Sequence, residues 1–291
     1  MNSRYLGGVY MAIAASIWGA MYVISKILLK TVQPMELVWL RYVIGLIALA
    51  VSILATKQSW KIQWRHLPHI AAVGMIGYGL SIYTQFLGTQ LSTAQMGAMI
   101  TSATPAFMVI FARIILHEKI TARRAISVGI ATTGVLMIVG VNGASSSFEL
   151  GGVILGIAAL TWALMSVLVK RVPRDYSPLT VTMYAMIIAT IFMTPMAIPQ
   201  IMQTPLGEWL HPGMWGGLFY LGVISTAGAF FLWNKGLQLM EASSGGVFFF
   251  FQPLVGTFLG WIVLGERVGL IFWLGAALIV LSVTLVFRDT H

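Results

Sequence analysis

Residues 236–269, GLQLMEASSGGVFFFFQPLVGTFLGWIVLGERVG, decide the fold because their pattern occurs a second time in the chain. The earlier copy is residues 88–121, GTQLSTAQMGAMITSATPAFMVIFARIILHEKIT. In each copy an apolar segment follows a small or polar turn, carries a proline near its middle and ends close to a glutamate. Such a repeat indicates an internal duplication and governs how the rest of the chain is interpreted. The landmarks that share one offset of 148 positions are Gly88 with Gly236, Ala94 with Ala242, Pro105 with Pro253, and Glu118 with Glu266.

Composition predicts an integral membrane protein. Of the 291 residues, 58% are hydrophobic and only 9% are charged, whereas about 25% of the residues in a soluble domain are charged. The net charge of +9 could suggest a nucleic-acid partner. The basic residues, however, lie in short connections between apolar runs, as membrane topology requires, and we expect no nucleic-acid partner. The chain has no cysteine, which excludes disulfides, thiolate metal sites and cysteine nucleophiles.

Ten apolar segments are long enough to cross a bilayer, which takes about 20 residues in a helix. Each segment must satisfy its own backbone hydrogen bonds in lipid, so all ten are predicted to be helices. The sequence therefore predicts an all-α integral membrane protein with ten transmembrane helices. The predicted spans are Tyr5–Leu29, Met35–Ala55, Leu67–Leu87, Ala94–Leu116, Ala125–Val141, Leu150–Val169, Leu179–Ile201, Trp215–Trp233, Ser243–Leu264 and Leu270–Phe287.

The basic residues also predict the orientation. With the N-terminus in the cytoplasm, twelve lysines and arginines fall on the inner side, and only Lys30 and Arg267 fall clearly outside. This asymmetry follows the rule that inner loops carry the excess of Lys and Arg. We therefore predict a multi-pass protein of the cytoplasmic (inner) membrane with both termini cytoplasmic.

The duplication divides the chain into two five-helix repeats, residues 1–143 and 144–291, with the small polar link NGASSSF (142–148) at the boundary. An odd number of helices in each repeat means that the second repeat enters the membrane upside down. Inverted repeats of this kind are common in secondary transporters. The first helices match at an offset of 144, and the change to 148 fits a four-residue insertion in residues 200–212. The matching pairs are Trp18 with Trp162, Lys26 with Lys170, and Pro34 with Pro178.

Together these features resemble the drug/metabolite transporter superfamily, EamA type, over essentially the whole chain. The features are five plus five spans, a WG or WA pair in the first helix of each repeat, Arg41 early in the second helix, and the proline-to-glutamate pattern of the fourth. The resemblance implies a small-metabolite transporter, usually an exporter, with a central cavity formed by helices 1, 3, 4, 6, 8 and 9. Members carry varied solutes, so no substrate is implied. His117 departs from the family, which often has glycine before this glutamate.

The two prolines are the first candidates for the substrate site. Pro105 and Pro253 each free a carbonyl four residues earlier and bend their helix, and broken helices at matching positions of inverted repeats point to a binding site. A packing kink is the alternative. Beside them, Thr101, Thr104 and Gln252 carry polar groups that are costly against lipid, so they face either another helix or a wet cavity.

Aromatic and polar side chains on the other expected cavity helices complete the candidate set. Those with aromatic rings could instead form a belt at the membrane interface, an alternative that applies to Tyr22. At most one or two rings of the run at residues 248–251 can face a cavity, and Phe249 is the candidate there. The remaining candidates are Trp18, Tyr22, Tyr78, Tyr83, Gln85, Trp162, Trp233 and Asn234.

Three charged residues lie close to the outer side, namely Lys26, Glu36 and Arg41. The two cations could extend to lipid headgroups, or Arg41 could pair with Glu36 or bind a substrate carboxylate. No Asp, Glu or His lies in the middle of a predicted span, with Glu36 the nearest exception, so we predict exchange or facilitated diffusion rather than proton coupling. The histidines lie in connections or at the tail, and we expect no metal and no cofactor.

The sequence thus predicts a secondary transporter that exports or exchanges a small metabolite, such as an amino acid or a related solute, by alternating access. Its expected partners are the bilayer and a small-molecule substrate, and its expected state is a monomer or a weak homodimer formed through Gly256 and Gly260. A non-transporting scaffold or receptor would need a sizeable extramembrane domain. A membrane-embedded enzyme would need a nucleophile with a base or a metal cluster, and the sequence contains none of these patterns.

Overall fold

In its described residues, the first part of the chain is helical over most of the length of its predicted spans. The computed structural model describes residues 3–92, 94–101, 103–139, 146–264 and 270–288, and these residues contain no strand. Up to residue 139 the helices are α1 (Ser3–Leu28), α2 (Pro34–Ala55), the 3₁₀ turn η1 (Trp64–His66), α3 (Leu67–Val73), the π-helical η2 (Gly74–Ser81), α4 (Ile82–Leu91), α5 (Ala94–Thr101), α6 (Thr104–Ile115) and α7 (Ala122–Val139).

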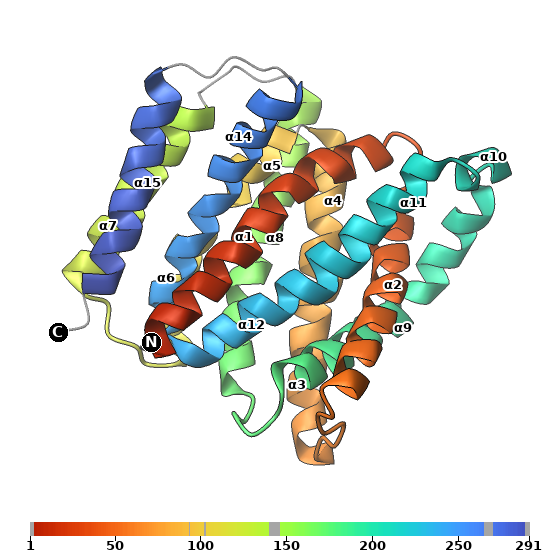
Figure 1. Ribbon diagram of the computed structural model, residues 1–291, viewed down its shortest axis with the longest axis horizontal. Helices are drawn as coiled ribbons and strands as arrows, with labels where there is room; N and C mark the ends of the chain where they lie inside the picture. Colours follow the sequence, from red (N-terminus) through yellow and green to blue (C-terminus); the bar gives the residue numbers. More distant parts are fainter. Residues whose placement is uncertain (1–2, 93, 102, 140–145, 265–269, 289–291) are drawn as a thin grey trace.

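The second part repeats this order (Figure 1). Its helices are α8 (Ser146–Leu168), the 3₁₀ turn η3 (Val169–Arg171), α9 (Pro178–Gln203), the short α10 (Leu206–Trp209), α11 (Pro212–Phe219), the π-helical η4 (Tyr220–Gly228), α12 (Ala229–Leu239), α13 (Ala242–Gly245), the 3₁₀ segment η5 (Gly246–Phe250), α14 (Phe251–Leu264) and α15 (Leu270–Arg288).

Six helical stretches are long and apolar enough to cross a membrane. They confirm the membrane fold and six of the predicted spans, while the other four predicted spans are helices that are shorter or broken, so the total of ten crossings stays a prediction. Large apolar side chains such as Ile47, Phe192 and Met202 are exposed on the outside of the bundle, where lipid can cover them. The six stretches are Tyr5–Leu28, Pro34–Ala55, Trp64–Leu91, Leu150–Arg171, Pro178–Gln203 and Pro212–Leu239.

Equivalent helices of the two parts of the chain make equivalent packing contacts. Helix α1 packs against α12 and α14, and its repeat mate α8 packs against α4 and α6. The pair α2–α9 and the pair α7–α15 each join two mates, and α7 and α15 lie together at one edge of Figure 1. The two parts therefore interlock, each supplying helices to the packing surface of the other.

The third and eighth spans each change to a π-helix where another helix crosses closely. A Cβ atom on Gly74, in η2, would lie 2.3 Å from the carbonyl oxygen of Ala185, and one on Gly222, in η4, would lie 3.0 Å from that of Arg41. These contacts are repeat mates, since 74 and 222 differ by 148 and 41 and 185 by 144. Only glycine lets the backbones approach this closely.

Both predicted proline breaks are present. In the first repeat α5 ends at Thr101 and α6 begins at Thr104, immediately before Pro105. In the second, 3₁₀ geometry in η5 precedes α14, which contains Pro253. Because proline removes a backbone donor, the helix before it is free to change geometry.

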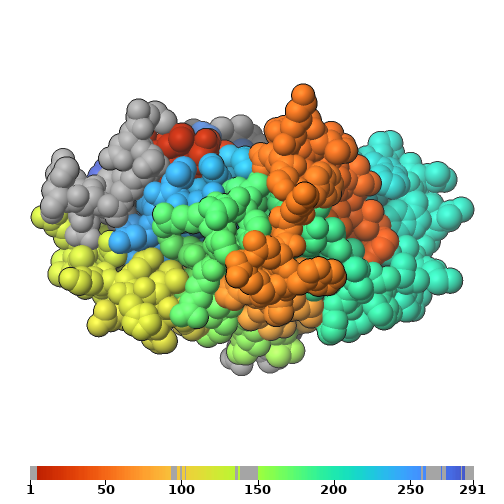
Figure 2. Space-filling model, turned by 90° about the horizontal axis from the view of Figure 1, so that it is seen from below, coloured from red at the N-terminus to blue at the C-terminus, as the bar shows by residue number. Residues whose placement is uncertain are grey.

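The connections rich in Lys and Arg gather at one end of the bundle. Figure 2 views this end, with the α2–α3 connection in orange, the α6–α7 connection in yellow and the α8–α9 connection in green. The start of α1 and the end of α15 lie toward the same end in Figure 1. This arrangement agrees with the topology expected from the basic residues, and the side of the membrane stays a prediction.

Candidate functional site

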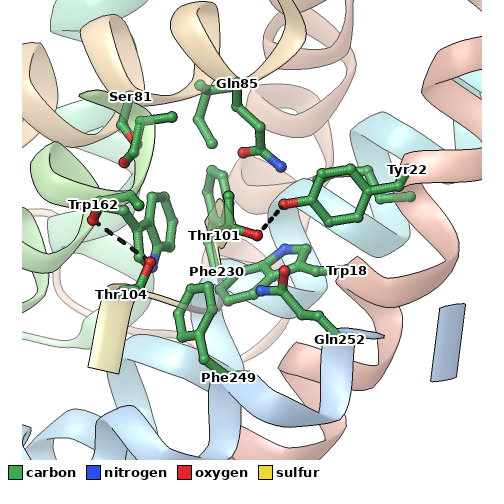
Figure 3. A pocket seen from close by; sticks show the side chains of 14 residues that line it. Trp18, Tyr22, Ser81, Gln85, Thr101, Thr104, Trp162, Phe230, Phe249 and Gln252 are labelled. Carbon is green, nitrogen blue, oxygen red and sulfur yellow. Dashed lines mark hydrogen bonds between the residues drawn. The ribbon is translucent and has the colours of Figure 1, made fainter. Parts of the chain in front are cut away.

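A pocket lies at the centre of the bundle, where helices from both repeats meet (Figure 3). Four pairs of repeat mates contribute to its wall: Trp18 with Trp162, Ile82 with Phe230, Thr101 with Phe249, and Thr104 with Gln252. The pocket therefore lies where the inverted repeats face each other. Its full lining is Trp18, Met21, Tyr22, Ser81, Ile82, Gln85, Thr101, Thr104, Ala158, Ala159, Trp162, Phe230, Phe249 and Gln252.

Aromatic rings form a continuous wall on one side of the pocket. The ring centroids of Trp18 and Trp162 are 5.2 Å apart at an interplanar angle of 85°. Phe230 lies 5.5 Å from Trp162 and 5.8 Å from Trp18, and Phe249 lies 5.7 Å from Trp18. The pairs of Trp18 with Trp162 and with Phe230 are edge-to-face and the other two are tilted, and such aromatic pairs add stability beyond burial. The wall is therefore a packed apolar surface.

Most polar groups of the pocket already have protein partners. The hydroxyls of Tyr22 and Thr101 are hydrogen-bonded at 2.8 Å, and Ser81 Oγ donates to the carbonyl of Ala158 at 2.8 Å. Trp18 Nε1 donates to the carbonyl of Ser225 at 2.9 Å. These bonds orient the lining and link five different spans.

Within the described part of the chain, two buried polar atoms at the pocket have no hydrogen-bond partner. They are Nε1 of Trp162, a donor, and Oε1 of Gln252, an acceptor. Both side chains are more than nine-tenths buried, and Figure 3 shows them in the pocket wall. A buried polar group left without a hydrogen bond is costly, so such groups mark places where a ligand or water can bind. The pocket thus offers one donor and one acceptor to a bound molecule.

In the present conformation the pocket is small. The centre of a water molecule can reach only about 20 Å³ of it, and one water needs about 10–15 Å³ on this measure. The space therefore suits a water rather than a metabolite, and a larger molecule could enter only if the surrounding helices or side chains moved.

Of the fourteen candidates expected to form the cavity, eight line this pocket: Trp18, Tyr22, Gln85, Thr101, Thr104, Trp162, Phe249 and Gln252. Tyr22 is buried in the bundle, so it does not belong to an interfacial belt. Pro105 and Pro253 lie beside the pocket and shape its helices without lining it, because the side chains one turn before them, Thr101 and Phe249, occupy the wall.

The other four candidates lie behind the wall or away from it. Tyr78 stacks on Phe230 with centroids 4.7 Å apart, and its hydroxyl accepts a 2.8 Å bond from Asn234 Nδ2. Trp233 packs 4.7 Å from Phe249. Asn234 lines a second pocket near the end of α8 together with Lys170 and Arg174. Tyr83 is half-buried against the edge of the core.

Six lining residues were not expected: Met21, Ser81, Ile82, Ala158, Ala159 and Phe230. For two of them, the helical spacing in the sequence could have indicated a place in the pocket wall. Ser81 and Ala158 each precede a candidate, Gln85 and Trp162, by one helical turn and so share its face. Phe230 is the repeat mate of Ile82, but neither has a polar group to draw attention to it.

The charged candidates do not extend to the lipid surface as expected for snorkelling side chains. Lys26 Nζ donates to the carbonyls of Thr89, Gln90 and Ser92 at 2.8, 3.1 and 2.6 Å. These carbonyls are at the C-terminal end of α4, where a cation is favourable. Its mate Lys170 donates to the carbonyls of Leu237 and Met240 at the end of α12. Two of the three acceptors of Lys26, Thr89 and Ser92, lie 148 positions before the two acceptors of Lys170.

Arg41 and Glu36 are buried but do not pair with each other. Both oxygens of Glu36 bond to Thr204 Oγ1, at 2.8 and 2.9 Å, and Oε2 also accepts from the backbone of Gln33. Arg41 instead bonds to Thr226 and Ser225 of η4. Pairing with Glu36, one of the alternatives for Arg41, is therefore contradicted, because the two residues are five positions apart on the same helix and project from different faces.

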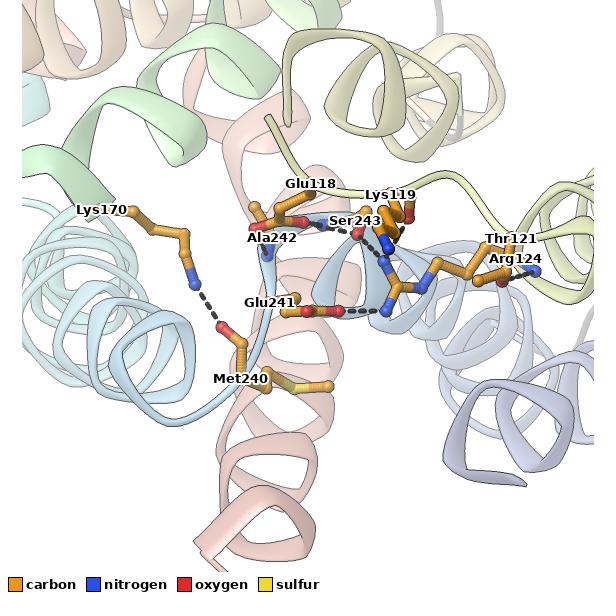
Figure 4. Close-up of polar contacts among 9 residues, drawn as sticks. All are labelled: Glu118, Lys119, Thr121, Arg124, Lys170, Met240, Glu241, Ala242 and Ser243. Carbon is orange, nitrogen blue, oxygen red and sulfur yellow. Dashed lines mark hydrogen bonds and ion pairs between the residues drawn. The ribbon is translucent and has the colours of Figure 1, made fainter. Parts of the chain in front are cut away.

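At the end of the bundle viewed in Figure 2, a polar cluster joins the two repeats (Figure 4). Glu118 accepts from the backbone N–H groups of Ala242 and Ser243, both at 3.2 Å, and so caps the start of α13. Arg124 bonds to Ser243 Oγ at 2.9 Å and forms an ion pair with Glu241. Glu266, the mate of Glu118, lies outside the described residues.

In the part of the chain that the structure describes, no group of three His, Asp or Glu side chains could hold a metal ion. The chemistry of the central pocket consists of hydrogen bonding, aromatic contacts and the charge of nearby Arg41. Such a site can bind and orient a small molecule.

Comparison with known proteins agrees with this arrangement. The EamA-like transporter family matches residues 5–140 and 150–288. An uncharacterized transporter of Archaeoglobus fulgidus is 28% identical over 282 residues, covering 96% of this chain and 98% of that protein. The permease-like protein YdzE of Bacillus subtilis is 66% identical over 70 residues, covering 24% of this chain and 90% of that protein.

One solved crystal structure shares the fold, with a TM-score of 0.78, 18% sequence identity and 99% coverage of both chains. Because the family match extends over nearly all of the sequence, the chain is a multi-pass membrane transporter that belongs to the EamA-like transporter family, within the drug/metabolite transporter superfamily.

Proposed function

We propose that this transporter is a secondary carrier that exports or exchanges a small metabolite by alternating access, and that the central pocket is its substrate site. The observation that carries the proposal is the lining of the pocket by four pairs of repeat mates. A site between two inverted repeats can be reached from either side of the membrane when one repeat rocks against the other. We retain the repeat boundaries 1–143 and 144–291, the cytoplasmic termini and the inner-membrane location as parts of this proposal.

The equivalent contacts of Lys26 and Lys170 support a mechanism in which the protein alternates between two related conformations. Lys26 holds the end of α4, and Lys170 holds the end of α12, with acceptors at equivalent positions. Helices α1 and α8 end at opposite sides of the bundle in Figure 1, so the same device occurs at both ends. Repeats with equivalent ends can exchange conformations, which is the structural basis of alternating access.

The unpartnered atoms support recognition of a polar solute. A substrate that accepts a hydrogen bond from Trp162 Nε1 and donates one to Gln252 Oε1 would satisfy both atoms at once. Apolar parts of the same molecule would pack on the aromatic wall. Small metabolites that carry both donors and acceptors, including amino acids, have this character.

Efflux from proteoliposomes tests the proposal. The full chain is reconstituted, the vesicles are loaded with a pool of amino acids, nucleobases and short carboxylic acids, and release is followed by mass spectrometry against protein-free vesicles. We expect saturable release of one solute class that accelerates when the same solute is present outside. Trp162→Phe removes the free N–H and should slow release about tenfold, because one hydrogen bond contributes about 1 kcal/mol or somewhat more.

Trp39→Phe is the matched control, since Trp39 Nε1 bonds to Thr194 in the α2–α9 contact and its ring does not line the pocket. Equal rates for the two variants would place the substrate elsewhere.

A second measurement addresses coupling of transport to protons. Exchange should not follow an imposed pH gradient, and a rate that rises and falls with the gradient would contradict uncoupled transport.

A further inference from the structure

Arg41 is a buried cation without an anionic partner. Its side chain is 0% exposed within α2, and among the described residues no carboxylate lies within ion-pair distance of its guanidinium. An ionised side chain in a membrane bundle is costly unless it is paired, and such residues commonly serve a substrate. The position therefore calls for a functional explanation.

Neutral groups hold the guanidinium in place. Nε donates to Thr226 Oγ1 at 2.7 Å and Nη2 donates to Ser225 Oγ at 3.3 Å. The rings of Phe86 and Phe230 lie 5.2 and 5.8 Å from its central carbon, within the range of cation–π attraction. These contacts orient the positive charge but leave it uncompensated.

One contact of Arg41 is weak and faces the substrate pocket. Nη1 donates to the thioether sulfur of Met21 at 3.3 Å, and sulfur is a weak acceptor. Met21 and Phe230 both line the central pocket, so one layer of side chains separates the guanidinium from it. Methionine is flexible and adapts to its surroundings, so Met21 can move aside for a bound molecule. A carboxylate in its place would make a stronger, charge-assisted bond.

The charge of Arg41 bears on which solutes the pocket can hold. No lining residue of the pocket is charged, and Arg41 contacts two of them, Met21 and Phe230. The aromatic wall alone would suit an apolar group or an organic cation. A positive charge across one side-chain layer, in a low dielectric, repels a cation and attracts an anion.

We propose that Arg41 selects substrates that carry a carboxylate, either as a monocarboxylic acid or as a zwitterionic amino acid, and that Met21 moves to let the carboxylate reach Nη1. This inference rests on the proposed function of the central pocket. Arg41 would thereby be a specificity-determining residue, since the carboxylate of the substrate would neutralise its charge.

The test compares solutes that differ only in their carboxylate. Vesicles containing the full chain are loaded with phenylalanine, leucine and alanine, the primary amide of each, and the amine that each would leave on decarboxylation. Protein-free vesicles correct for leakage. We expect wild type to release at least one amino acid about tenfold faster than its amide and its amine.

Two substitutions at Arg41 separate charge from structure. Arg41→Gln should reduce the ratio of amino-acid to amide release about tenfold, whereas Arg41→Lys keeps the charge and should keep most of the ratio. A purely structural role would lower all rates together and leave the ratio unchanged. Preferential release of amides or amines by wild type would overturn the inference.

A second pair of variants applies if Arg41→Gln does not fold. Met21→Glu places a carboxylate next to Nη1 and should abolish the preference, while Met21→Gln is its neutral control and should retain it. If Trp162→Phe slows release but none of the Arg41 and Met21 variants alters the ratio, Arg41 is not the selector and the proposed site stands. If wild type releases none of these solutes above leakage but releases nucleobases from the mixed pool, this inference fails and the proposed function stands. If it releases nothing from either set of solutes, both fail.

Discussion

At the scale of single residues, equivalent positions of the two repeats differ in their hydrogen bonding at the pocket. Trp18 and Trp162 are repeat mates, yet Trp18 Nε1 donates to the carbonyl of Ser225 and Trp162 Nε1 has no partner. Likewise Gln252 keeps a free acceptor where its mate Thr104 has a short hydroxyl side chain. The duplication supplies a symmetric frame, and the unmatched polar atoms within it provide a place for an asymmetric solute.

The bond between Arg41 and Thr226 should be a measurable part of the stability. Thr226→Val preserves shape but removes the acceptor 2.7 Å from Nε. A hydrogen bond to a charged group contributes about 1.5–3 kcal/mol, so we expect the free energy of unfolding to fall by about 2 kcal/mol. Denaturation in mixed detergent micelles measures it.

Thr190→Val provides the control for this experiment. Its hydroxyl is also buried but bonds only to the carbonyl of Met186 in its own helix. We expect this change to alter the free energy of unfolding by less than about 1 kcal/mol. Similar losses for both variants would mean that the Arg41 bond has no special weight.

At the scale of helices, the ends of α4 and α12 depend on cations from other spans. The last carbonyls of a helix lack partners within it and carry a partial negative charge. Lys26 reaches the carbonyls of α4 from α1, and Lys170 reaches those of α12 from η3. The adjacent helices α5 and α13 begin directly after these ends, so the lysines also determine how the broken fourth and ninth spans enter the membrane.

Removing either ammonium should weaken the packing of one span end. Lys26→Met and Lys170→Met keep most of the apolar stem but leave backbone carbonyls without donors. We expect each to lower the free energy of unfolding by about 1–2 kcal/mol. Because the sites lie at opposite ends of the bundle, the double variant should show the sum of the two losses.

Lys30→Met is the matched control, because Lys30 is exposed just beyond the end of α1. Surface substitutions of this kind usually change stability by less than about 0.5 kcal/mol. An effect as large as that of Lys26→Met would show that general charge, rather than helix capping, accounts for the losses.

At the scale of the whole molecule, one end of the interface between the repeats is held by charge. Glu118 and Arg124, from the first repeat, contact residues 241–243 of the second. The positions equivalent to Glu241 and Arg124 at the other end are Thr93 and Phe272, which cannot form an ion pair. The pseudo-symmetry is therefore broken at the ends, where the two faces of the membrane impose different charge.

Locking this interface should stop transport. The chain has no native cysteine, so Arg124→Cys with Glu241→Cys forms a single reactive pair at positions whose side chains are in contact. A short bis-thiol cross-linker should arrest efflux, because alternating access requires each end to open in turn. Reductant should restore the rate, and each single-cysteine variant should be insensitive to the reagent. Unchanged efflux from the cross-linked pair would show that this end does not open.

Local sequence properties were sufficient for the main features of the fold. Apolar runs about 20 residues long predict membrane helices because lipid leaves the backbone no other donor or acceptor. The offset of 148 between Pro105 and Pro253 identified the two broken spans, since proline disrupts a helix wherever it lies. The same reasoning identified eight residues of the pocket wall, because polar or aromatic groups deep in a span seldom face lipid.

The partners of those residues were decided only by the tertiary structure. Arg41 meets Thr226 and Ser225 because α2 packs against η4, and nothing within α2 itself specifies those partners. Likewise, Lys26 has a stem long enough for the lipid headgroups or for the carbonyls of α4, and only the packing of α1 beside α4 selects the latter. Spans follow from the hydropathy of the chain and the repeats from residues that recur at a fixed offset, whereas a pocket forms from the packing of helices that are distant in sequence.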